Sequence, residues 1–104
     1  MDYVFEIVDK TERKIHLTKE RWNHILKHPN MDDSIEKIKK ALENPTTIRY
    51  NENDEKVRYY YLEFKSNYPS ERYLLISVKY LNNHGFIITS FFTNKITGIK
   101  WKVK

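Results

Sequence analysis

The chain of 104 residues contains no cysteine. Without cysteine there is no disulfide framework, no thiolate zinc site and no cysteine nucleophile. No apolar run approaches the length of about 18 residues that a membrane-spanning helix needs. The opening MDYVFEIVDK also does not have the layout of a signal peptide. We therefore expect a cytoplasmic protein that does not associate with membranes.

Internal repeats, low-complexity tracts and linkers are also missing, so a single domain over residues 1–104 is expected. Hydrophobic residues make up 39% of the chain and aromatic residues 14%. A chain of this length buries roughly two-thirds of its unfolded surface on folding. One hydrophobic core is therefore enough.

Acidic residues are absent from the last third of the chain. Lys and Arg number 19 against 14 Asp and Glu, which gives a formal charge of +5. From Arg72 to the end there are basic residues and no acid. This excess suits a polyanion such as the phosphate backbone of RNA, because Lys and Arg release its condensed counterions. An ordinary soluble surface with extra lysines is the alternative.

Two helices are expected before residue 45. Thr18 is an N-cap candidate for a first helix that ends at Pro29 and carries an apolar stripe. Asp33 and Glu36 have the spacing of a capping box for a second helix that ends at Asn44-Pro45.

Alternation of β-branched and aromatic residues predicts the strands. They are expected at Tyr3–Val8, Lys14–Leu17, Thr47–Tyr50, Val57–Phe64, Tyr73–Leu81 and Phe86–Thr93. The short polar connections between the last four favour antiparallel hairpins. The predicted fold class is therefore α+β, with two helices packed on one face of a four-stranded antiparallel sheet and a short strand or hairpin at the N-terminus.

Three polar side chains of the first helix should project from one stripe. Arg21, His24 and His28 fall at i, i+3 and i+7. Imidazole accepts and donates protons near neutral pH, so this pattern is typical of acid-base chemistry, although histidines that merely cover apolar surface are an alternative. A zinc ion between the two histidines would need a third ligand, which is hard to name because His16 and His84 lie on other elements.

The expected strand Tyr73–Leu81 should place Lys79 on the face away from the core. Thr89 and Thr93 share a face of the next strand. A lysine and hydroxyls on adjacent strands can bind a phosphate, although threonine is also a favoured strand residue without any function.

The three consecutive tyrosines at positions 59–61 cannot all lie on one side of a strand. At least one ring should therefore be exposed and able to stack on a base, and the adjacent Arg58 could contact a phosphate. Packing within the sheet is the alternative.

Three runs of the sequence, followed by a Lys-Trp tail, resemble the phage-associated nuclease families of the barnase, EndoU, colicin and RelE-like (BECR) superfamily. The runs are LTKERWNHILKHPNM, ENPTTIRY and YLLISVKYLNNHGFIITSFFT. The resemblance implies a metal-independent ribonuclease, often a toxin or phage-conflict effector, with two helices and a four-stranded sheet. One departure is Lys27-His28-Pro29-Asn30, where the families often have Arg-His-Pro-Glu.

The resemblance and the residue patterns together predict a site without metal or cofactor. His24 and His28 are the acid-base candidates, Arg21 and Lys79 the phosphate stabilisers, and Thr89 and Thr93 the hydroxyl donors, with Ser90 as an alternate. Further nucleic-acid contacts are expected from Lys27, Arg58, Tyr60, Lys95, Lys100 and Lys102. RNA is the expected partner, together with an acidic antitoxin or immunity protein. A non-catalytic RNA-binding or partner-binding module is the alternative.

Overall fold

The structure is a computed structural model that describes residues 3–100. Its strands and helices follow one another as β1 Tyr3–Val8, β2 Lys14–Thr18, α1 Lys19–Ile25, α2 Ile35–Glu43, β3 Thr47–Tyr50, β4 Val57–Glu63, the 3₁₀ turn η1 Pro69–Glu71, β5 Tyr73–Leu81, β6 His84–Thr93 and β7 Ile99–Lys100.

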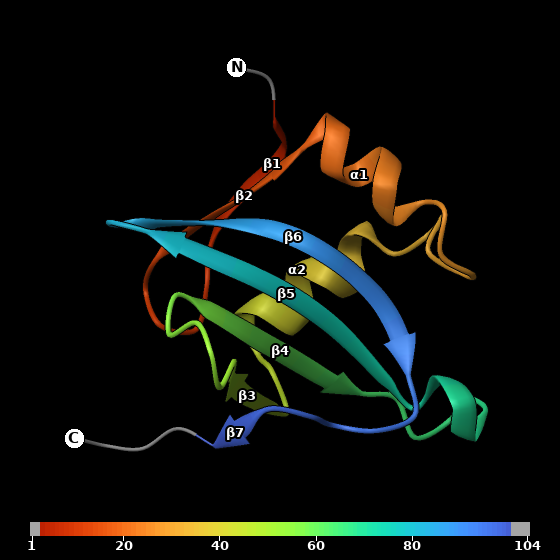
Figure 1. Cartoon of the computed structure of the whole chain (residues 1–104). Coiled ribbons are helices and arrows are strands. Elements are labelled where there is room, and N and C mark those ends of the chain that lie inside the picture. The colour runs from red at the N-terminus through yellow and green to blue at the C-terminus, as the bar shows by residue number, and fades with distance from the viewer. Residues whose placement is uncertain (1–2, 101–104) are drawn as a thin grey trace.

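All the strands join one mixed sheet, so the expected four-stranded antiparallel sheet is wrong. The sheet has seven strands in the order β1-β2-β6-β5-β4-β3-β7. The neighbours β2 and β6 are parallel, and the other neighbouring pairs are antiparallel. The N-terminal hairpin extends one edge of the sheet, and β7 extends the other beside β3 (Figure 1).

The two helices are short, with seven and nine residues. As predicted, the Thr18 side chain caps α1 by accepting a hydrogen bond from the Arg21 backbone N–H. The helix nevertheless ends at Ile25, and a turn leads to Pro29. In α2 the predicted capping box is replaced by Ser34 at the N-cap, whose hydroxyl donates to the Met31 carbonyl instead.

The core lies between α2 and one face of the sheet, which we call the inner face. On β5 the inner-face residues Leu74, Ile76 and Val78 are fully buried, as their alternation predicts. They pack with Ile38 and Leu42 of α2. In Figure 1, α2 lies behind β4 and β5, and α1 lies beyond the β6 edge.

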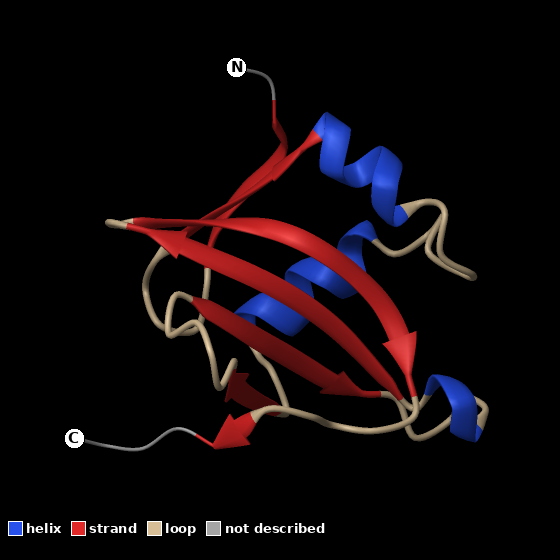
Figure 2. Ribbon diagram, in the orientation of Figure 1, coloured by secondary structure: helices blue, strands red, loops and turns tan. Residues whose placement is uncertain are grey.

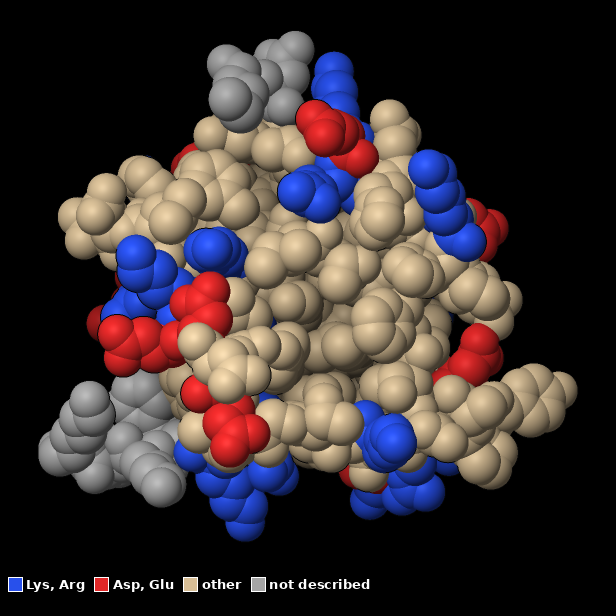
Figure 3. Space-filling model, viewed as in Figure 1, with Lys and Arg blue, Asp and Glu red and all other residues tan. Residues whose placement is uncertain are grey.

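The opposite face of the sheet, the outer face, is not covered by a helix (Figure 2). The segment 94–98 packs against it, where the Thr97 backbone N–H donates to the Tyr61 hydroxyl over 3.1 Å. Figure 3 shows uncharged side chains and a hollow at the centre of this face, with charged side chains around its rim. Within residues 3–100, no helix has the length and apolar character needed to cross a membrane.

Candidate functional site

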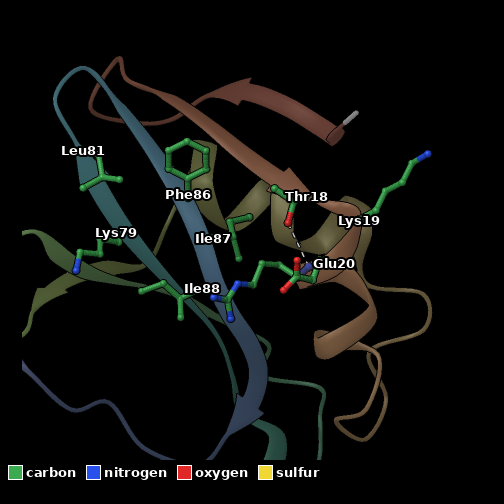
Figure 4. A pocket seen from close by; sticks show the side chains of 9 residues that line it. Thr18, Lys19, Glu20, Lys79, Leu81, Phe86, Ile87 and Ile88 are labelled. Atoms are coloured by element: carbon green, nitrogen blue, oxygen red, sulfur yellow. Dashed lines mark hydrogen bonds between the residues drawn. The ribbon is translucent and has the colours of Figure 1, made fainter. Parts of the chain in front are cut away.

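A cleft opens on the outer face between the start of α1 and strands β5 and β6. Its volume is about 610 Å³. Its lining residues are Thr18, Lys19, Glu20, Arg21, Lys79, Leu81, Phe86, Ile87 and Ile88. We call it the α1 cleft. Figure 4 shows it with Lys79 and Leu81 on one side and the α1 side chains on the other.

Two of the predicted phosphate-binding residues line this cleft. Arg21 is exposed on α1 and Lys79 is partly exposed on β5, so residues 58 positions apart in the chain reach one hollow. Lys79 Nζ also lies 3.6 Å from the Asp54 carboxylate. An exposed ion pair of this kind contributes little to stability, so Lys79 can exchange its partner at little cost.

The two predicted acid-base histidines come next along the chain, His24 on α1 and His28 in the turn after it. The rings of His24 and His28 lie 5.8 Å apart between centroids, edge to face. His28 Nε2 is 3.5 Å from the Thr89 hydroxyl, and the His28 ring is 5.3 Å from that of Phe91. Because α1 ends at Ile25, the following turn positions His28, through its backbone N–H bonded to the Ile25 carbonyl.

A β-bulge shapes the wall of the cleft opposite α1. Ser77 pairs with Thr89, whereas the next residue, Val78, pairs with Ile87. Ile88 is therefore the extra residue of the bulge, and it lines the cleft directly beside Thr89. Bulges redirect side chains and increase local twist, and they are over-represented next to active sites.

The remaining predicted hydroxyls lie elsewhere. Thr93 pairs with Tyr73, four residues beyond Thr89, and is therefore about 13 Å farther along the strand. Ser90 is fully buried, and its hydroxyl donates to the Leu75 carbonyl over 2.7 Å. Ser90 therefore does not reach the cleft.

Two of the predicted nucleic-acid contacts, Tyr60 and Arg58, are buried in the structure. Tyr60 is fully buried on the inner face and its hydroxyl donates to Asp9, so the ring cannot stack on a base. Arg58 is 8% exposed and lies against the rings of Tyr50 and Tyr80. Of the three tyrosines in the row, Tyr59 is the one that keeps partial exposure.

The predicted lysine contacts are exposed where the structure describes them. Lys27 follows α1, Lys95 lies in the segment after β6, and Lys100 lies on β7. Lys102 is outside the described residues.

A further histidine, His16, lies beside the cleft, although the sequence patterns did not assign it to the site. His16 on β2 is 6% exposed, and its Nδ1 lies 3.0 Å from the Glu6 carboxylate. Its ring stacks on Tyr3 and lies 5.2 Å from Phe86, which lines the cleft. Burial lowers the pKa of His16, with nearby His84 acting in the same direction, although Glu6 opposes them. Near neutral pH this imidazole is therefore uncharged.

Alternation would have placed His16 on the outer face, between the buried Ile15 and Leu17. The missing information was the pairing of β2 with β6, which brings His16 opposite Phe86.

No group of three or more His, Cys, Asp or Glu side chains in residues 3–100 is arranged to hold a metal ion. No protein-family model, curated protein or solved structure matches the chain.

Proposed function

We propose that the chain is a metal-independent endoribonuclease that cuts RNA in the α1 cleft. The observation that supports this proposal is the gathering of predicted site residues around β6. Arg21 and Lys79 line the cleft, and His28 approaches Thr89 next to it. These residues come from a helix, a turn and two strands.

The chemistry would begin at the RNA's own 2′-hydroxyl. A neutral imidazole takes the proton of this hydroxyl, the oxygen attacks the adjacent phosphorus, and the bond from phosphorus to the 5′-oxygen breaks. A protonated imidazole donates its proton to the departing 5′-oxygen, which leaves a 2′,3′-cyclic phosphate. His24 and His28 would share these two roles.

The cations and hydroxyls would stabilise the negative charge that develops on the phosphate. Arg21 offers a planar guanidinium that can bind two phosphate oxygens at once, and Lys79 offers a point charge from a rigid strand. The Thr89 hydroxyl is close enough to His28 to orient the imidazole. Thr93, farther along β6, would contact a neighbouring nucleotide.

A second candidate function is RNA binding, or docking of an acidic partner such as an antitoxin or immunity protein, without cleavage. Lys95 and Lys100 favour it, because both are exposed in a segment without acidic residues. In that case the histidines would only cover the edge of the sheet.

The test compares RNA cleavage by the wild-type protein, His24→Ala, His28→Ala and His84→Ala in excess EDTA. Loss of an acid-base group lowers the rate by about 10²-fold or more, so cleavage by His24→Ala and by His28→Ala should fall by that factor while RNA binding persists. His84→Ala is the matched control, because His84 is exposed at the start of β6 and has no role in the proposed chemistry. Unchanged cleavage by both His24→Ala and His28→Ala would contradict the assignment. RNA binding with no cleavage by the wild type would support the second candidate.

A further inference from the structure

A second hollow lies where the turn between β1 and β2 meets β3 and β4. Its volume is about 520 Å³. The residues that line it are Lys10, Thr11, Arg13, Pro45, Thr47, Ile48, Tyr50 and Arg58. We call it the turn pocket. It shares no lining residue with the α1 cleft.

The lining of the turn pocket is strongly basic. Lys10 and Arg13 come from the β1–β2 turn and Arg58 comes from β4, and no lining residue is acidic. The buried carboxylate of Asp9 lies at the base of the same turn, but its oxygens already accept hydrogen bonds from this turn and from two tyrosines. The turn also carries the exposed Glu12, which is not among the lining residues, so the three cations of the pocket outnumber the two carboxylates of the turn.

The two guanidinium groups are held in place by aromatic rings. Arg58 lies 4.5 Å from the centre of the Tyr80 ring and 5.2 Å from that of Tyr50. Arg13 lies 4.8 Å from the Tyr80 ring. Cations fixed in this way lose little conformational freedom when a ligand binds, which favours affinity.

The turn that carries Lys10 and Arg13 is also fixed. One oxygen of Asp9 accepts the backbone N–H groups of Thr11 and Arg13 over 3.0 and 2.9 Å. The Lys10 backbone N–H donates to the Leu42 carbonyl at the end of α2 over 2.9 Å. The positions of the lysine and arginine backbones are therefore set before any ligand arrives.

We propose that the turn pocket binds the phosphate group of a phosphate ester. Three converging cations suit a doubly charged oxyanion better than a single carboxylate, and guanidinium groups match the geometry of phosphate oxygens. The hollow is larger than a bare phosphate, and the Pro45, Ile48 and Tyr50 side chains give an attached organic group an apolar wall.

The first experiment titrates the protein with inorganic phosphate and monitors the backbone amide signals by two-dimensional NMR. Ionic strength is held constant with sodium chloride. The amides of residues 10–13, 50 and 58 should shift in a saturable manner, and Lys10→Gln/Arg13→Gln should weaken binding by about tenfold or more, since two charge-assisted contacts are lost. Lys37→Gln/Lys65→Gln, which removes two exposed lysines outside the pocket, should bind as the wild type does.

Two outcomes would overturn the proposal. One is a set of phosphate-induced shifts that is spread over lysines throughout the surface. The other is equal affinity in the wild type and the pocket variant, and if the double variant does not fold, Lys10→Gln alone carries the same comparison.

A second arm identifies the source of the phosphate. Adenosine monophosphate carries a terminal phosphate, whereas a short RNA with hydroxyl groups at both ends carries only phosphodiesters. If the pocket amides report tighter binding of adenosine monophosphate than of the RNA, the ligand of the pocket is a small phosphate ester. If the pocket amides shift with the RNA but not with adenosine monophosphate, the ligand of the pocket is the phosphodiester backbone of a nucleic acid.

Discussion

At the scale of single residues, Asp9 links strands β4 and β5 to the turn between β1 and β2. It is 5% exposed, and one of its oxygens accepts hydrogen bonds from the Tyr60 and Tyr80 hydroxyls. Burial acts to raise the pKa of Asp9, but these hydrogen bonds and those from the turn outweigh it, so the pKa is lowered. The same burial, with the bond to Asp9, raises the pKa of Tyr80 to about 12.

The lowered pKa of Asp9 predicts how stability depends on pH. Its contribution is complete above the unfolded pKa of 3.8 and is lost as the pH falls through the lower folded value. Asp9→Asn replaces an acceptor by an amide that cannot satisfy all these donors, so the free energy of unfolding at pH 7 should fall by about 2 to 4 kcal/mol. Urea unfolding of the wild type and Asp9→Asn at pH 7 and pH 3 measures this free energy.

The Asp9→Asn variant should also lose part of the acid sensitivity of the wild type, so that the two stabilities approach each other near pH 3. The partial control is Tyr80→Phe, which removes the hydroxyl that donates to Asp9 and also contacts the Tyr60 hydroxyl, and which should cost about 1 to 2 kcal/mol. A constant difference between wild type and Asp9→Asn at both pH values would show that Asp9 is not ionised in the folded protein.

At the scale of elements, the parallel pairing of β2 with β6 attaches the N-terminal hairpin to the sheet. Ile15 of β2 lies opposite Gly85 of β6. A Cβ atom at Gly85 would lie 2.8 Å from both Ile15 Cδ1 and Val78 Cγ1, and 3.1 Å from the Tyr80 ring. The missing side chain therefore allows the strands and the core to approach each other here.

Gly85→Ala should accordingly destabilise the fold by about 1 to 3 kcal/mol through overpacking. Asn83→Ala, in the exposed turn before β6, is the control and should change stability by less than about 0.5 kcal/mol. Thermal unfolding of the two variants measures the difference. Equal melting temperatures would mean that β2 adjusts freely and that the pairing is loose.

The sequence predicted most of the strands but not how they join. Alternation of apolar residues predicted the observed bounds of β5, Tyr73–Leu81, and its buried residues Leu74, Ile76 and Val78. The pairing of β2 with β6 connects segments about 70 residues apart, and alternation specifies a face without specifying a neighbour. The two-residue strand β7 is too short to carry any pattern.

The site was predictable to a similar extent. Both Arg21 and His24 lie on α1, but helical spacing could not place the turn that carries His28 after the early end of this helix. The tyrosine row left its inward and outward members open, and burial of Tyr60 followed from its hydrogen bond with Asp9. The turn pocket was missed because its cations are contributed by a polar turn and an inward-facing arginine.

At the scale of the whole molecule, the outer face would serve as the surface that meets RNA, while α2 and the core support it from behind (Figure 1). The uncharged centre of this face and its charged rim agree with a strand of bases over the sheet and phosphates at the edge (Figure 3). The excess charge of the chain would then act through lysines near this rim.

This arrangement predicts a specific salt dependence. Lys95→Gln/Lys100→Gln should weaken binding of single-stranded RNA and reduce the slope of log affinity against log salt by about 0.7 for each lysine. Lys37→Gln/Lys40→Gln on α2, behind the sheet, removes the same charge and should leave the slope near that of the wild type. Fluorescence anisotropy over a series of salt concentrations measures both, and equal slopes in the two variants would rule out a dedicated binding edge.

The central claim, RNA cleavage through the 2′-hydroxyl, is tested most directly with a pair of matched substrates. One is a short RNA with a preferred cleavage position, and the other carries a single 2′-deoxy sugar immediately 5′ to that phosphate. Nearly all phosphate contacts are the same in both, so affinities should agree within about twofold. We expect that in EDTA the first substrate is cut to a 2′,3′-cyclic phosphate and the second stays intact. Cleavage of both at equal rates would contradict it.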